Sequence, residues 1–130
     1  MAAGASNAHV VGGAYQSEVS SSAFGGAVNG SWRLTLRGGT YTFRFTGHTL
    51  KNVILAGGYS LLGRRITLHE KTAACSSQTA SGGCAPLLRC RGTGVYRFKL
   101  SGRDLNFVRV SDPQCASRRI VLSGPFHRRA

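Results

Sequence analysis

The stretch that decides the fold is residues 31–46, which read S-W-R-L-T-L-R-G-G-T-Y-T-F-R-F-T. Apolar and polar side chains alternate on both sides of the central Gly38-Gly39 pair. A period of two places successive side chains on opposite faces of a strand, and two adjacent glycines favour a tight turn. The stretch therefore predicts a β-hairpin with one apolar face and one polar face.

The same alternation continues along the chain, and its three prolines lie outside the apolar runs. We predict an all-β fold of eight strands with short connections. Eight antiparallel strands can close into an up-and-down barrel, which removes exposed sheet edges; a β-sandwich is the alternative. The predicted strands cover residues 32–37, 41–46, 50–55, 59–62, 64–70, 95–100, 105–110 and 119–122, with turns at Gly57-Gly58 and Ser101-Gly102.

The 130-residue length suits one compact domain. Residues 1–29 are rich in Gly, Ala and Ser, which predicts a flexible N-terminal arm. Residues 30–130 then form the barrel domain. No apolar run approaches the ~20 residues that a membrane-spanning helix needs, so we expect no transmembrane segment.

The chain is strongly basic, with 17 Lys+Arg against 4 Asp+Glu and a formal net charge of +13. Such a charge attracts polyanions such as nucleic acid, acidic polysaccharide or anionic lipid without specificity. The basic residues are spread along the whole chain and accompany no recognition helix. A solvated basic surface explains the charge most simply, and a polyanion-binding surface protein is an alternative.

The four cysteines, Cys75, Cys84, Cys90 and Cys115, allow three fully bridged pairings. No C-x2-C spacing occurs and the histidines are scattered, so we expect neither a metal site nor a cofactor. Closure of the polar loop from Cys75 to Cys84 would restrain it, and Cys90 could then join Cys115. Disulfides indicate a secreted or cell-envelope protein. Residues 1–6 lack the features of a signal peptide, so either a signal was removed or the protein is cytoplasmic with free thiols.

The interior of an eight-stranded barrel either accommodates one small ligand or is filled by side chains. Aromatic residues of the predicted strands would line a cavity, with the tyrosine hydroxyls as orienting groups. The same residues would equally make a solid core, and the pattern does not separate the two. These residues are Tyr41, Phe43, Phe45, Tyr59, Tyr96, Phe98 and Phe107.

Two motifs resemble known proteins. Gly30-Ser31-Trp32 looks like the G-x-W that opens the first strand of lipocalins and other calycins. The last two fifths of the chain are similar to small secreted lipocalin-like proteins of actinobacteria, which are largely uncharacterised. That similarity is carried by Cys90-x-Gly92-Thr93-Gly94-Val95-Tyr96-Arg97-Phe98, Leu105-x-Phe107, Val110-x-Asp112-Pro113-x-Cys115-x-x-Arg118, Val121-Leu122 and Pro125-Phe126-x-Arg128.

The resemblance implies an eight-stranded calycin barrel and a bridge between Cys90 and Cys115. It also implies that Arg128 covers Trp32 and closes one end of the barrel through a cation–π contact. The chain departs from the family pattern where Phe98 and Phe126 replace tryptophans.

Catalytic motifs are absent from the sequence, which favours a binding protein over an enzyme. Glu70 is the one weak catalytic candidate, because alternation puts it on the face of Ile66 and Leu68. Burial there would raise its pKa and suit a general acid. A surface ion pair with Lys71 is the simpler interpretation.

The leading hypothesis is therefore a lipocalin-like protein that binds a small apolar or amphipathic molecule, including an anionic one, in the barrel cavity. The alternative from another class is a cofactor-free cyclase or isomerase of natural-product biosynthesis, which would act by holding a flexible substrate in a reactive conformation. The sequence leaves the oligomeric state open.

Overall fold

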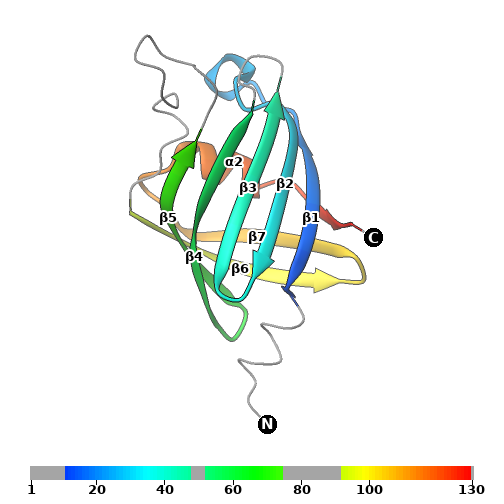
Figure 1. The fold of residues 1–130 in the computed structure, drawn as a ribbon, viewed down its shortest axis with the longest axis vertical. Helices are drawn as coiled ribbons and strands as arrows, with labels where there is room; N and C mark the ends of the chain where they lie inside the picture. The colour runs from blue at the N-terminus through cyan, green and yellow to red at the C-terminus, as the bar shows by residue number, and fades with distance from the viewer. Residues whose placement is uncertain (1–10, 48–51, 75–91, 130) are drawn as a thin grey trace.

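The computed structural model describes residues 11–47, 52–74 and 92–129. Within them, eight antiparallel strands pair in chain order, and β1 pairs with β8 to close a barrel (Figure 1). This confirms the predicted up-and-down barrel. The elements are β1 Gly13–Val19, the 3₁₀ helix η1 Ala23–Gly26, β2 Gly30–Arg37, β3 Thr40–Gly47, β4 Val53–Leu62, β5 Arg65–Ala74, β6 Thr93–Ser101, β7 Asp104–Ser111, the helix α2 Ala116–Leu122 and β8 Phe126–Arg128.

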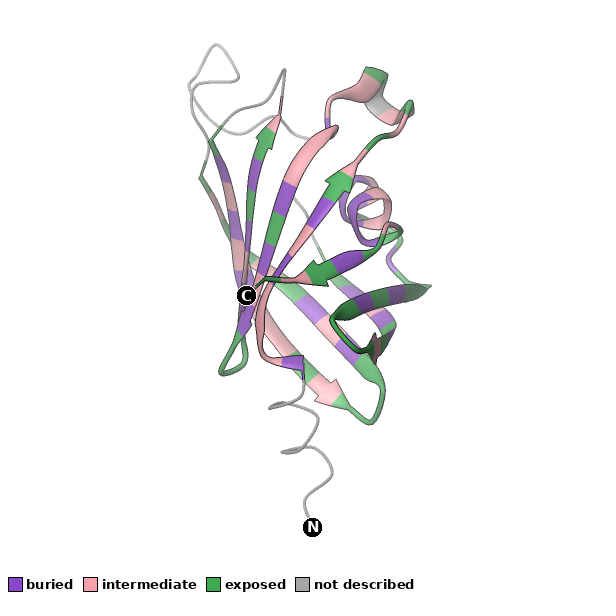
Figure 2. Ribbon diagram, turned by 90° about the vertical axis from the view of Figure 1, so that its right-hand side faces the viewer, coloured by how far each residue is buried: buried purple, intermediate pink, exposed green. Residues whose placement is uncertain are grey.

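The hairpin predicted from residues 31–46 is confirmed as β2 and β3. Trp32 pairs with Phe45 and Leu34 pairs with Phe43, and all four side chains are buried. Figure 2 shows the resulting alternation of buried and exposed bands along the strands. Gly38 and Gly39 make the turn with φ values of 59° and 84°, a backbone conformation in which glycine avoids the steric cost of a side chain.

The predicted turn at Gly57-Gly58 is wrong, because both glycines lie inside one ten-residue strand, β4. Ala56 pairs with Thr72 whereas Gly57 pairs with Glu70, so Lys71 is an extra residue on β5. This is a β-bulge, in which one strand carries a residue without a counterpart. A glycine pair inside an apolar run can mark either a bulge or a turn, and the pairing partner decides between them.

The strand predicted over residues 119–122 is also wrong, because these residues belong to α2. The helix buries Ser117, Arg118, Val121 and Leu122, which recur at helical spacing. At its N-cap, the Sγ of Cys115 accepts a hydrogen bond from the Arg118 amide at 3.4 Å. A short apolar run such as Ile120-Val121-Leu122 fits a strand or a buried helix equally well.

The predicted boundary at residue 30 differs from the structure, since β1 precedes it and is integral to the barrel. All seven residues of β1 pair with β2, and Tyr15 and Ser17 are buried. The G-x-W tryptophan Trp32 thus lies in the second strand, not the first. Small residues in β1 hide its alternation, and the three residues of β8 are too few to show one. The predicted number of strands equals the observed number, eight, because two kinds of error cancel. The prediction omitted β1 and β8, but it divided β4 into two strands and took part of α2 for a strand.

No helix in the three described ranges is long and apolar enough to cross a bilayer.

Candidate functional site

The aromatic residues predicted to line a cavity all lie in or against the barrel core. Six of them are buried, and Tyr59 is partly buried and packs against the core. Several pack ring to ring: Trp32 stacks on Phe45 with centroids 4.2 Å apart, and Phe107 meets the edges of Tyr96 and Phe126. Within the described residues these rings act as core-filling side chains.

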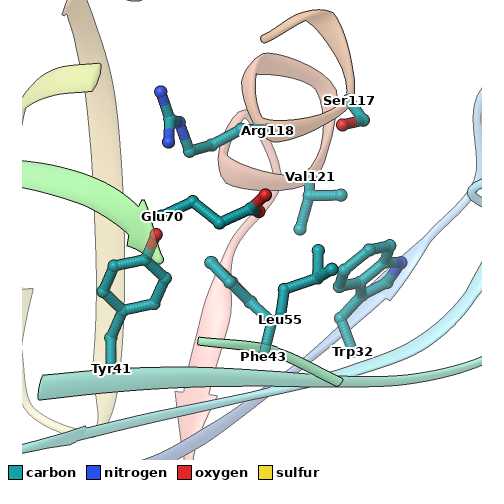
Figure 3. A pocket seen from close by; sticks show the side chains of 8 residues that line it. All are labelled: Trp32, Tyr41, Phe43, Leu55, Glu70, Ser117, Arg118 and Val121. Atoms are coloured by element: carbon teal, nitrogen blue, oxygen red, sulfur yellow. The ribbon is translucent and has the colours of Figure 1, made fainter. Parts of the chain in front are cut away.

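One interior space lies between α2 and the strands, and its volume is about 10 Å³. A cavity of that size holds roughly one water molecule. Figure 3 shows Ser117, Arg118 and Val121 of α2 on one side of it and aromatic side chains of β2 and β3 on the other. This space beside α2 is too small for a ligand or for the polyketide-sized substrate of a cyclase. The lining residues are Trp32, Tyr41, Phe43, Leu55, Glu70, Ser117, Arg118 and Val121.

A buried ion pair borders this cavity. The Nε and Nη2 of Arg118 each donate a hydrogen bond of 2.7 Å to the carboxylate of Asp112, and both side chains are almost fully buried. The Tyr96 hydroxyl donates a third hydrogen bond, of 2.5 Å, to Oδ2 of Asp112. The guanidinium Nη1 is buried and has no hydrogen-bond partner among the described residues. A bidentate arrangement of this kind fixes the position of both side chains.

Local backbone features bring these groups together. Asp112 follows the end of β7, and Arg118 lies in the first turn of α2. Gly94 of β6 lies beneath the pair, where a Cβ would be 2.8 Å from both Arg118 Nε and Asp112 Oδ2. A side chain at residue 94 would therefore push the ion pair apart.

The electrostatics of this cluster favour neutral tyrosines and a charged arginine. Burial raises the pKa of Tyr41 to about 12, and the nearby Arg118 charge acts in the opposite direction. Burial, and then the hydrogen bond to Asp112, raise the pKa of Tyr96. Burial acts to lower the pKa of Arg118, but the hydrogen bonds and charge of Asp112 outweigh it and raise that pKa. Both hydroxyls remain hydrogen-bond donors at neutral pH.

Glu70 lines the cavity, on the side of β5 that the alternation with Ile66 and Leu68 predicts. The bulge at Lys71 follows immediately and adds one residue to β5. The next inward-facing residue is therefore Ala73, which pairs with Leu55. In Figure 3 the Glu70 side chain extends between α2 and the aromatic residues. With space for about one water beside it, Glu70 has no room for a substrate next to its carboxylate in the described structure.

The aromatic ring that Arg128 covers is Tyr15, not Trp32 as the resemblance implied. The guanidinium carbon lies 5.2 Å from the Tyr15 ring centroid, and Nη2 donates to the Tyr15 hydroxyl at 2.6 Å and to the Gly12 carbonyl at 3.2 Å. Trp32 instead stacks on Phe45 and donates from Nε1 to the Val28 carbonyl at 2.8 Å. Tyr15 and Arg128 are paired residues of the neighbouring strands β1 and β8. Arg128 thus contributes to barrel closure by tying β8 to β1.

Cys115 is buried at the start of α2. Cys75, Cys84 and Cys90 lie outside the described residues, so both predicted disulfides stay predictions. In the described ranges, no three His, Cys, Asp or Glu side chains gather as ligands for a metal ion.

A much larger recess lies outside the barrel, in the groove between β7, α2 and η1. Its volume is about 600 Å³. On the side of β7 away from β6, β8 pairs only with Asp104 and Leu105, and α2 also contacts β7. We call this recess the α2 groove. Its lining residues are Ala23, Val108, Arg109, Ala116, Arg119, Ile120 and Ser123.

Sequence reasoning missed the α2 groove and the Asp112–Arg118 pair. In the sequence, Asp112 directly precedes Pro113, a pattern typical of a turn. The spacing of Asp112, Cys115 and Arg118 was the available signal, since an acid before a capped helix can meet a basic residue in that helix's first turn.

No family model, curated protein or solved structure matches this chain. The eight-stranded barrel is compatible with a lipocalin-like fold, and no match assigns the chain to that family.

Proposed function

We propose that the protein binds a small amphipathic anion in the α2 groove. The observation that carries the proposal is the lining of the groove, in which two arginines, Arg109 and Arg119, accompany apolar side chains and no carboxylate. Guanidinium groups recognise carboxylate, sulfate or phosphate head groups by charge-assisted hydrogen bonds.

Size and polarity support this choice of site. Pockets for small molecules typically span roughly 300–1,000 Å³, a range that includes the α2 groove and excludes the interior cavity. Val108 and Ile120 offer an apolar surface for a hydrocarbon tail, and Val108 is 66% exposed. The formal net charge of +13 adds a long-range attraction for anions. The proposal keeps the binding-protein hypothesis and places the site on the outside of the barrel.

The proposal can be tested by titration calorimetry with two amphiphiles that have the same tail length and opposite charge. They are dodecanoate, an anion, and dodecyltrimethylammonium, a cation. Dodecanoate should bind and the cation should not. The double variant Arg109→Gln/Arg119→Gln should weaken dodecanoate binding by about tenfold or more, because each hydrogen bond to a charged group contributes roughly 1.5–3 kcal/mol.

The matched control is Arg33→Gln/Arg44→Gln, which removes the same charge from exposed positions on β2 and β3. Its affinity should stay within about twofold of the parent, because screened charges outside the site contribute little. Equal losses in the two double variants would overturn the proposal. So would dodecanoate-induced NMR shifts confined to interior residues such as Tyr41 and Phe43.

We also propose that the protein is exported and carries two disulfides. The polar loop between Cys75 and Cys84 and the buried position of Cys115 support this assignment. Intact-mass measurement of protein from its own host, alkylated before and after reduction, should show no labelled cysteine before reduction and four after it. Four labelled thiols without reduction would place the protein in a reducing compartment instead.

A further inference from the structure

The outer surface of the barrel aligns four side chains from the neighbouring strands β4, β5, β6 and β7. Leu62 pairs with Arg65 across the β4–β5 hairpin, Arg65 pairs with Arg97 of β6, and Arg97 pairs with Val108 of β7. All four residues are exposed. We call these four residues the outer row.

The two ends of the outer row are unusually exposed apolar side chains. Leu62 is 81% exposed and Val108 is 66% exposed. Leu62 lies at the tip of the β4–β5 hairpin, directly before the Gly63 turn and the exposed Arg64 and Arg65. A leucine at a hairpin tip flanked by arginines has the composition of a segment that enters a lipid interface while its cations remain at head-group level.

The centre of the outer row is a like-charge pair. Arg65 and Arg97 lie directly opposite each other on neighbouring strands, an arrangement that destabilises a sheet unless an anion compensates it. The four acids of the chain do not supply one: Glu18 is on β1, Glu70 lines the interior cavity, Asp104 pairs with His127 and Asp112 pairs with Arg118.

We propose that the outer row docks the protein on an anionic lipid surface, with Leu62 inserted among the acyl chains and Arg65 and Arg97 contacting head groups. Charge alone would suit any polyanion. The exposed leucine and valine at the two ends of the row favour a lipid bilayer, because apolar side chains gain from contact with acyl chains and gain nothing from a sugar-phosphate backbone. Val108 borders both the outer row and the α2 groove, but the cations differ: Arg65 and Arg97 in the row, Arg109 and Arg119 in the groove.

Co-sedimentation with phosphatidylcholine vesicles, with and without phosphatidylglycerol, measures the docking. The parent should partition onto the phosphatidylglycerol vesicles only. The Leu62→Ser variant should lower the partition coefficient by about tenfold, because an inserted leucine loses its apolar contact. The Arg65→Gln/Arg97→Gln variant should lower it by a similar factor.

The charge-matched control is again Arg33→Gln/Arg44→Gln, a second cross-strand arginine pair that has no highly exposed apolar neighbour in its row. It should retain at least half of the binding. An equal loss in the control would show that net charge alone is responsible and would overturn the proposal. Unchanged vesicle binding by Leu62→Ser would also overturn it. So would a parent protein that binds heparin but does not bind the vesicles.

A direct readout of insertion comes from Leu62→Trp. The natural tryptophan, Trp32, is buried, so a fluorescence change on vesicle addition reports residue 62. A blue shift with phosphatidylglycerol vesicles is the expected result, and an unshifted spectrum on bound vesicles contradicts insertion. Because Leu62 is almost fully exposed, these variants should keep the circular dichroism spectrum of the parent.

Discussion

Asp112 makes three hydrogen bonds inside the barrel and neutralises Arg118 there. Asp112→Ala should lower the free energy of unfolding by about 3–5 kcal/mol, because it leaves a buried guanidinium without its counter-charge. Urea denaturation measures the loss. Asp104→Ala is the control: its carboxylate also meets a side chain, the Nδ1 of His127 at 2.6 Å, but both side chains are more than half exposed, so its loss should cost roughly 0–1 kcal/mol.

The double variant Asp112→Leu/Arg118→Met separates charge from packing. Replacing both charges with apolar side chains removes the desolvation cost along with the attraction, so the double variant should be more stable than Asp112→Ala. A double variant that is as unstable as the single one would mean that the hydrogen bonds, and not the orphaned charge, account for the loss.

Tyr41 gives the protein a pH dependence in the alkaline range. Its pKa is 10.0 in the unfolded chain and about 12 in the folded protein, because burial disfavours the phenolate. A raised folded-state pKa means that the stabilisation is complete below pH 10 and is lost as the pH rises through about 12. The free energy of unfolding, from urea titrations at fixed pH, should therefore fall between these values. The fall should be smaller in Tyr41→Phe, and an identical pH profile in that variant would contradict the assignment.

At the level of elements, the neighbouring residues Gly57 and Gly58 of β4 differ greatly in the space available to a side chain. A Cβ at Gly57 would clash with the His69 carbonyl oxygen and lie 2.9 Å from the Glu70 Cα, whereas the nearest atoms to a Cβ at Gly58 are 3.7 Å away. Gly57→Ala should destabilise the protein by on the order of 1–3 kcal/mol, since the backbone at the bulge must shift. Gly58→Ala should change stability by less than about 0.5 kcal/mol. Thermal unfolding of both variants checks the contrast, and similar midpoints for the two would refute the close approach at the bulge.

At the scale of the whole molecule, the barrel has one weak seam. β8 pairs through two residues with β1 and through two with β7, whereas β2 and β3 pair along eight. Amide hydrogen exchange should therefore be fastest in β8 among the strands, because local opening needs few hydrogen bonds to break. Arg128→Ala should raise that exchange about tenfold or more, since Arg128 anchors β8 to Tyr15 and Gly12. Arg129→Ala removes only an exposed hydrogen bond to Gln16 of β1 and should have a smaller effect; equal effects would argue against the anchor.

The sequence by itself determined the fold class and the strands whose two faces differ. In residues 31–37 and again in residues 41–46 every second side chain is apolar, and a strand with one buried face must show that period whatever its partners are. The inward direction of Glu70 followed from the same rule. Where the two faces do not differ, as in Gly13 and Ala14 of β1, or where a run is short, as in Ile120-Val121-Leu122, the pattern carried no information on the element type.

The tertiary structure alone decided what the interior and the outer surface can do. Whether aromatic residues line a cavity or fill it depends on how closely opposite walls approach, and α2 contributes Arg118 and Val121 to the space that a ligand would need. The Asp112–Arg118 pair, the α2 groove and the outer row join residues from different strands and from α2. Alternation specifies which face of a strand a side chain occupies, but register and barrel closure specify which side chains meet on that face, and these depend on contacts between distant parts of the chain.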